Sequence, residues 1–309
     1  MKTYLRVAVF GAFAAGFTLT ATAADTLDPG DPDEALLISN KLFCDNEEGK
    51  PSLYWWKGTM YSRIPGEKDR HLFDVHGMNI RACKKFEDPV KGIGFRSVSR
   101  EAMFYIDPET GEVINEWENP WTGEVVEVVH VANDPVNARR ANWSRDEDGN
   151  GRINFDRYTI QDGIAMSGGG AARLFYENPL SGDYQDYVGH KYHATEFLTM
   201  AFPWEDAIDS SKTAIQDAVI SWGRISGWMP WMKMRGREGL VVFYTHGMRL
   251  HDWSELPDVI RNEIETNYPV YMSPPPLDDN RPNDTSWTVF KRYVDEKRAR
   301  EAAESEGGE

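Results

Sequence analysis

From Leu53 to about Leu250, the chain is a series of short segments rich in Val, Ile, Tyr, Phe and Trp, and turn sequences separate them at close intervals. This composition and spacing are typical of β-strands. Residues 107–111 (DPETG) and 119–123 (NPWTG) each place Pro early and Gly late, as hairpin loops do. The sequence therefore predicts antiparallel strands that pair in sequence order, three of them between Arg100 and Asn133.

Helical periodicity is confined to four segments, at residues 33–43, 206–220, 258–267 and 288 to about 303. Many consecutive antiparallel strands with few helices are typical of an up-and-down barrel. We therefore expect a mainly β fold, in which an antiparallel meander closes into a barrel or a strongly curved sheet. It would be lipocalin-like, with a few peripheral helices.

The first 24 residues have the pattern of a Sec-type secretory signal peptide. Lys2 and Arg6 form the positive region, an apolar stretch follows from Val7 to Leu19, and Ala21-Thr22-Ala23 fits a cleavage site. We expect residues 25–300 to form a single barrel-like domain and residues 301–309 (EAAESEGGE) to be a disordered acidic tail. The predicted location is the periplasm or the extracellular space.

The formal net charge of −16 argues against nucleic acid as a partner, because phosphate binding needs a basic surface. After residue 24, no stretch has the 18 or more consecutive apolar residues that a membrane helix needs. The sequence thus predicts no integral membrane segment after cleavage.

The chain has two cysteines, Cys44 and Cys83. In an oxidising compartment they are expected to form a structural disulfide, which would stabilise the fold by about 4 kcal/mol through loop closure. Two buried free thiols are the alternative.

His130 is the predicted acid–base group. It lies among valines in the segment from Glu124 to Asn133, and an imidazole titrates near neutral pH. If the strand is regular, His130 and Asn133 point to opposite faces. A core histidine satisfied by one hydrogen bond is the alternative interpretation.

Further polar and aromatic residues are candidates for positioning a ligand. Alternation along 71–81 places His76 beside Asp74 on one face and Asn79 on the other. Arg100 shares a face with apolar residues, which also fits a structural ion pair. The 11 Trp, 13 Tyr and 14 Phe residues suggest an aromatic-lined cavity, for which Tyr105 and Trp117 are candidates.

One loop in the sequence resembles a calcium-binding loop, and no other cofactor is expected. Asp146, Asp148 and Asn150 resemble the first ligands of an EF-hand loop, but its twelfth position is Arg157. A hairpin tip is the alternative, since Asp-Gly-Asn-Gly is a strong turn sequence. The pattern H-x-x-H-x-x-E at 190–196 has the wrong spacing for a metal site on a strand.

Several motifs resemble those of a bacterial and fungal family catalogued only as a domain of unknown function (DUF1838-like). They are GMNIR at 77–81, EWENP at 116–120, VHVANDPVN at 129–137, WMPWM at 228–232 and RPNDTSW at 281–287. The resemblance spans nearly the whole mature chain and implies that the barrel and the C-terminal segment form one unit. It implies no activity.

The leading functional hypothesis is an exported protein that binds a hydrophobic or aromatic small molecule and transforms it by cofactor-free acid–base chemistry, as an isomerase, lyase or hydrolase. His130 would transfer the proton. The alternatives are a non-catalytic carrier or sensor of an apolar ligand and an envelope protein with a protein partner.

Overall fold

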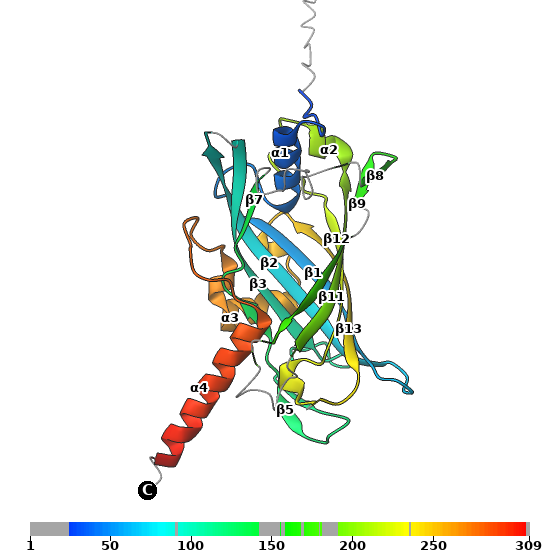
Figure 1. Ribbon diagram of the computed structural model, residues 1–309, viewed down its shortest axis with the longest axis vertical. Helices are drawn as coiled ribbons and strands as arrows, with labels where there is room; N and C mark the ends of the chain where they lie inside the picture. Colours follow the sequence, from blue (N-terminus) through cyan, green and yellow to red (C-terminus); the bar gives the residue numbers. More distant parts are fainter. Residues whose placement is uncertain are drawn as a thin grey trace, which may run out of the picture.

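The computed structural model describes residues 25–89, 92–141, 155, 158–167, 170–178, 180, 191–234 and 236–306. The main element of the fold is one large antiparallel sheet (Figure 1). Its strands are β1 (Ser52–Arg63), β2 (Arg70–Asp88), β3 (Gly92–Ile106), β6 (Val131–Asn133), β7 (Ala138–Ala141), β8 (Tyr158–Gln161), β9 (Ile164–Ser167), β10 (Gly170–Glu177), β11 (Lys191–Pro203), β12 (Val219–Ser226) and β13 (Leu240–Leu250). Two short strands, β4 (Glu116–Glu118) and β5 (Val125–Glu127), form a separate small sheet.

The strand order is β6-β3-β2-β1-β13-β12-β11-β9-β8, with β7 also paired to β3 and β10 also paired to β11. The mainly β, antiparallel fold is thus confirmed. The strands between Arg100 and Asn133 do not all pair in sequence order, because β3 pairs with β6 and β7, whereas β4 pairs with β5 in the separate sheet. The prediction of a closed barrel is wrong, because no pairing among the described strands joins β6 or β7 to β8, β9 or β10. The sheet stays open and curves around an interior (Figure 1).

The segment predicted as one strand from Glu124 to Asn133 is broken in the middle. Its first part, β5, pairs with β4, whereas its last part, β6, pairs with β3. Between them, residues 128–130 leave both sheets, and the amide of Val128 donates to the carbonyl of Asn115. Face alternation therefore does not hold across His130.

The helices are α1 (Pro32–Phe43), α2 (Trp204–Ile208), α3 (Asp258–Asn267) and α4 (Ser286–Glu306), with the short 3-10 turns η2 (Pro230–Met232), η3 (Trp253–Glu255) and η4 (Pro269–Met272). The helix predicted at 206–220 is wrong beyond Ile208. The side chain of Asp209 accepts from the amide and hydroxyl of Ser211, a local turn that competes with helix. Helix α4 continues to Glu306, into the segment expected to be a disordered tail.

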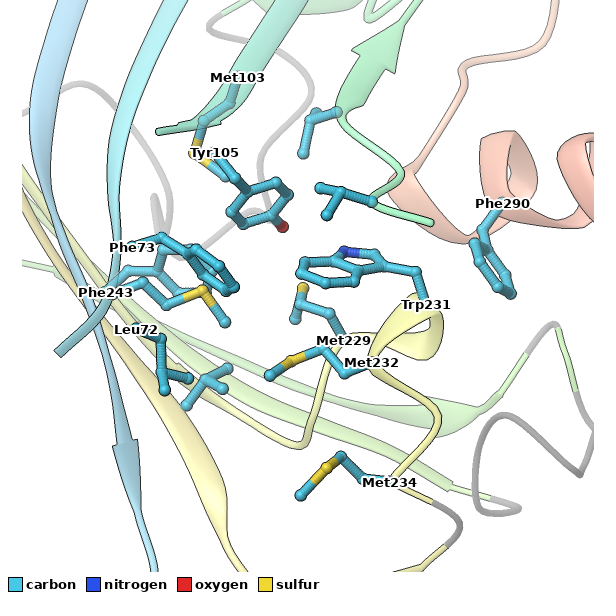
Figure 2. Packing of buried hydrophobic residues seen from close by; sticks show 14 of the residues in the cluster. Leu72, Phe73, Met103, Tyr105, Met229, Trp231, Met232, Met234, Phe243 and Phe290 are labelled. Carbon is cyan, nitrogen blue, oxygen red and sulfur yellow. The ribbon is translucent and has the colours of Figure 1, made fainter. Parts of the chain in front are cut away.

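Both faces of the sheet are covered, at least in part. On the convex side, α3 packs over β1, β2 and β3 through Ile260 and Ile264. On the concave side, the largest core cluster surrounds Trp231 of η2, which contacts Phe73 and Tyr105 (Figure 2). Helix α1 packs at the opposite end of the sheet from η2 and β5 (Figure 1). None of the described helices is long and apolar enough to cross a membrane.

Candidate functional site

A cavity of about 310 Å³ lies on the concave side of the sheet, between α1 and the core around Trp231. Its lining combines aromatic, apolar and charged side chains, which are Phe43, Tyr54, Trp56, Asn79, Arg81, Glu101, Met103, Val131, Arg140, Glu196, Leu198, Met200, Ile220, Trp222, Arg224 and Ser286. The volume is at the lower end of the range for small-molecule pockets. This cavity is the candidate site.

Strand alternation places the charged groups in the cavity. On β2, Met78 and Ile80 pack into the outer core beneath α3, so Asn79 and Arg81 point inward. On β3, the same alternation turns Glu101 inward. Three arginines and two glutamates therefore meet among mostly aromatic and apolar side chains on the concave surface.

The two carboxyl groups, Glu101 on β3 and Glu196 on β11, influence each other's ionisation. Burial raises the pKa of Glu101, and Arg81 and Arg224 oppose this shift. Burial also raises the pKa of Glu196, and the neighbouring Glu101 raises it further. Arg224 Nη1 lies 3.7 Å from Glu196 Oε1, too long a contact to cancel the cost of burial. At least one of the two carboxyls thus tends to keep a proton at a pH where an exposed glutamate is ionised.

Two arginines at the α1 end of the cavity lie close to each other. Arg81 Nε donates to Asn79 Oδ1 at 2.7 Å, and the guanidinium carbon of Arg140 lies 3.8 Å from the ring centroid of Phe43. Burial, and then the positive charge of Arg81, lower the pKa of Arg140 to about 10. Both groups are cations at neutral pH, because a guanidinium is not deprotonated in proteins.

Trp56 supplies an aromatic wall and a hydrogen-bond donor. Its strand neighbours in the register are Gly77 on β2 and Gly247 on β13, which leave room for the indole. A Cβ atom on Gly77 would lie 2.2 Å from the ring. The indole Nε1 is buried and has no hydrogen-bond partner in the described structure, so it is available to a ligand.

Comparison with known families identifies the chain. The model of the family described as "Protein of unknown function (DUF1838)" matches residues 49–294. The chain belongs to this family. No curated protein matches it. Among solved structures, the chain is matched to the crystal structure of Ail, the attachment invasion locus protein of Yersinia pestis, with 8% identity over 66% of this chain and 99% of Ail. The TM-score of 0.14 is too low for any conclusion.

Of the residues predicted for the site of this DUF1838 protein, Asn79 lines the cavity. Asn133 is not part of the lining but contacts Glu101, which is. Asn133 Nδ2 donates to Glu101 Oε1 at 3.4 Å, and its own Oδ1 is buried without a partner. The structure thus brings both amides to the charged part of the cavity.

His130 and Tyr105 lie beside the cavity and not in its lining. They line a smaller space of about 20 Å³ that shares Val131, Arg224 and Ser286 with the cavity. A space of this size holds about one water molecule. The amide of Tyr105 donates to His130 Nδ1, and burial lowers the pKa of His130 to about 4. His130 is therefore neutral at neutral pH.

The other three predicted positions lie away from the cavity. His76 is on the convex face, where its ring lies 5.8 Å from that of Trp55. Arg100 is also on that face, with Nε 3.0 Å from Asp134 and Nη1 donating to the carbonyls of Val270 and Ser273. Trp117 packs against Phe73 in the core. Arg100 thus forms a structural ion pair with Asp134, which was the alternative interpretation of this residue.

The sequence analysis missed the five charged cavity residues. A signal was present for three of them, because Glu101 shares its strand face with Met103, Glu196 with Leu198 and Met200, and Arg224 with Trp222. Arg81 and Arg140 have only small or polar neighbours two positions away. The disulfide between Cys44 and Cys83 is present and joins α1 to β2.

The calcium loop at Asp146, Asp148 and Asn150 lies outside the described residues. Within the described part of the chain, no group of three or more His, Cys, Asp or Glu side chains is placed to hold a metal ion. Residues 1–24, the expected signal peptide, also lie outside it.

Proposed function

We propose that this DUF1838 protein is exported and binds a small organic molecule with an apolar or aromatic body in the cavity of the curved sheet. There it transforms the molecule by proton transfer with Glu101 and Glu196. The observation that carries the proposal is the pair of neighbouring carboxyl groups with raised pKa in an aromatic-lined cavity of about 310 Å³. Perturbed titratable groups in a cleft are typical of active sites.

The two carboxyls suit a reaction that takes a proton from one atom of the ligand and returns one to another. The ionised carboxyl accepts the first proton, while the protonated carboxyl donates the second, so the pair ends with the same total of protons. Asn133 and Arg224 hold the two groups from either side. An isomerase or lyase fits this exchange, and it needs no redox cofactor.

His130 has a positioning role in this proposal, in place of the proton transfer that the sequence suggested. A histidine whose pKa is lowered to about 4 is a weak base, and its space beside the cavity fits only a water molecule. Its ring instead packs against Phe104 and Tyr105 and so stabilises β3, the strand that also carries Glu101.

Export is supported by the signal-like residues 1–24 and by the disulfide, which persists in oxidising compartments. A non-catalytic carrier would use the same cavity. The carboxyl pair is what favours the enzyme, because a carrier of apolar molecules gains nothing from two partly buried acids.

Native mass spectrometry of protein purified from its own cell envelope tests binding. We expect a retained organic mass that is lost on denaturation and absent from the Ile220→Trp variant, whose larger side chain fills the cavity. With that ligand in D₂O, the parent protein should incorporate solvent deuterium into it, and Glu101→Gln and Glu196→Gln should not. Binding without deuterium incorporation or turnover would contradict the enzyme and support the non-catalytic carrier. A retained mass that Ile220→Trp does not displace would contradict the cavity as the site.

A further inference from the structure

We propose that the ligand carries an acidic group, and that Arg81 and Arg140 bind this group at the α1 end of the cavity. The inference rests on the proposed function, because it names the class of molecule that the same cavity takes. The ligand would be an amphipathic organic acid, with a carboxylate or a comparable oxyanion at one end and an apolar or aromatic body at the other.

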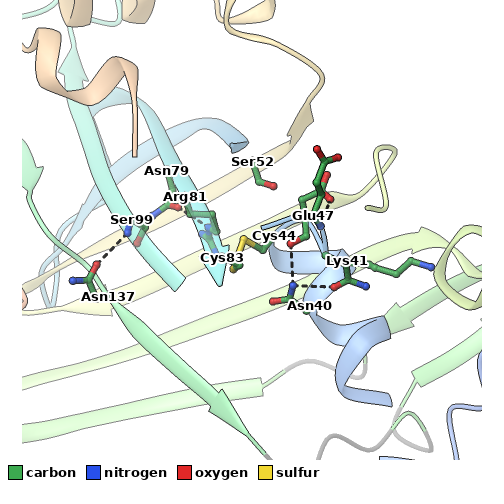
Figure 3. Close-up of a disulfide and its surroundings, with 12 residues drawn as sticks. Asn40, Lys41, Cys44, Glu47, Ser52, Asn79, Arg81, Cys83, Ser99 and Asn137 are labelled. Carbon is green, nitrogen blue, oxygen red and sulfur yellow. Dashed lines mark hydrogen bonds between the residues drawn. A yellow bond between two sulfur atoms is a disulfide. The ribbon is translucent and has the colours of Figure 1, made fainter. Parts of the chain in front are cut away.

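The positions of the two arginines define one end of the cavity. Arg81 lies two residues before Cys83 on β2, and the disulfide from Cys83 holds Cys44 at the end of α1 (Figure 3). Phe43 precedes Cys44 and stacks with Arg140. The arginines therefore lie beside α1, in a part of the fold that a covalent bond fixes.

Neither arginine has an ion-pair partner within 4 Å among the described residues. Arg81 uses one N–H for Asn79, and Arg140 lies against the face of the Phe43 ring. Each guanidinium carries five N–H donors, so most of their donors remain available. Glu101 attracts Arg81 at longer range. Two neighbouring, partly buried cations that no carboxylate contacts directly are nevertheless costly unless an anion joins them.

The charge of the cavity points to the same class of ligand. Three arginines face two glutamates, and the raised pKa of both glutamates reduces the negative charge they supply. The cavity is thus electropositive in a protein whose net charge is −16. Arginine pairs bind carboxylates and related oxyanions through paired N–H donors, which gives both affinity and orientation.

The apolar lining takes the rest of the molecule. Trp222 and Ile220 on β12 and Met200 on β11 line the cavity, and the Trp56 indole offers one further donor. With its acidic group at Arg81 and Arg140, the ligand would extend past Glu101 and Glu196. The anion site would therefore orient the reacting part of the molecule between the two carboxyls.

Two probes with the same aromatic body test the inference. The first is 8-anilinonaphthalene-1-sulfonate, which is an anion, and the second is N-phenyl-1-naphthylamine, which lacks the sulfonate. The variants are Arg81→Gln and Arg140→Gln. Arg139→Gln is the matched control, because Arg139 is the exposed neighbour of Arg140 on β7 and stacks on Phe86 instead. Fluorescence titration measures each dissociation constant, and Ile220→Trp identifies the part of the signal that comes from the cavity.

We expect Arg81→Gln and Arg140→Gln each to weaken cavity binding of the sulfonate by roughly tenfold or more, as expected for loss of a charge-assisted contact. Binding of the neutral probe and binding to Arg139→Gln should change by less than about twofold. If the sulfonate binds both arginine variants as tightly as the parent, the anion site is wrong while the cavity survives. If Ile220→Trp displaces neither probe, the cavity itself, and with it the proposed function, fails. Thermal unfolding of each variant shows which ones are folded.

Discussion

The indole of Trp56 on β1 lies directly across the backbone of Gly77 on β2, its partner in the strand register. A Cβ atom at residue 77 would come 2.2 Å from Cε2 and 2.3 Å from Nε1 of the ring. Gly77 therefore has a steric function, which is to let one large aromatic side chain form part of the cavity wall.

Gly77→Ala should displace the Trp56 indole and change the shape of the cavity. Overpacking of this kind costs about 1–3 kcal/mol of unfolding free energy. We expect a lower midpoint in urea denaturation and a shift of Trp fluorescence, together with weaker binding of N-phenyl-1-naphthylamine. Gly227→Ala is the control, because a Cβ atom there meets nothing within 4 Å. Equal stability of the two variants would mean that Trp56 has room to move.

Glu101→Gln should change how stability depends on pH. Because the pKa of Glu101 is raised on folding, the folded state holds this proton more tightly than the unfolded state does. The unfolding free energy of the parent therefore falls as the pH rises from about 4.5 through the folded-state pKa. The neutral glutamine removes this loss, so the variant should gain stability relative to the parent across that range.

Urea denaturation at a series of pH values measures this difference. Glu112→Gln serves as the control, since Glu112 is exposed in the turn after β3. A difference between parent and Glu101→Gln that does not grow with pH would show that Glu101 is ionised as readily in the folded as in the unfolded state.

Most of the strands, the disulfide and three of the four helices could be predicted, because their signals are local. Period-two alternation, Pro-early and Gly-late turns, and two cysteines in the chain do not depend on the tertiary structure. The failed helix after Ile208 also has a local cause, since the Asp209 side chain forms its own turn with Ser211.

The site could be predicted only in part, because both faces of β2 and β3 are buried. Alternation places Asn79 and His76 on opposite faces of β2. It does not predict which face lines the cavity and which is covered by α3. Glu101 and Glu196 are 95 positions apart in the sequence, on β3 and β11, and only the curvature of the sheet brings them together. No local pattern contains that information.

His130→Asn should make the fold less sensitive to acid. Burial lowers the pKa of His130 from 6.5 to about 4, so the unfolded state binds this proton more readily. The stabilising contribution is fully present above pH 6.5 and is lost as the pH falls toward 4, with an upper limit of about 3 kcal/mol. Asparagine keeps an acceptor for the Tyr105 amide and does not titrate.

The measurement for His130 is the unfolding free energy of parent and variant between pH 4 and pH 7. The two curves should converge as the pH falls, whereas His251→Asn, at an exposed position, should follow the parent. Parallel curves for His130→Asn and the parent would contradict the assigned shift in pKa.

Reduction of the Cys44–Cys83 bond should destabilise the fold by about 4 kcal/mol, since the bond closes a loop between residues 39 positions apart. Urea denaturation with and without a reductant measures the loss, and the Cys44→Ser/Cys83→Ser double variant should be insensitive to the reductant. Because Phe43 and Arg81 flank the two cysteines, reduction should also weaken sulfonate binding more than binding of the neutral probe. Equal effects on both probes would indicate that the bond supports the whole cavity and not the anion site.

The two halves of α4 should differ in their contribution to stability. Trp287, Phe290 and Val294 are buried in the core cluster, and the Trp287 ring lies 4.8 Å from Tyr192 of β11. The family match also ends at Val294. Among residues 295–305, whose burial the structure describes, only Lys297 is partly buried, through its contact with Glu127. Trp287→Ala should cost about 3–5 kcal/mol of unfolding free energy. A chain that ends after Arg298 should stay within about 0.5 kcal/mol of the full chain. If this truncation costs as much as Trp287→Ala, the end of α4 packs against a partner in solution, and the sedimentation coefficient of the full chain should then exceed that of a monomer.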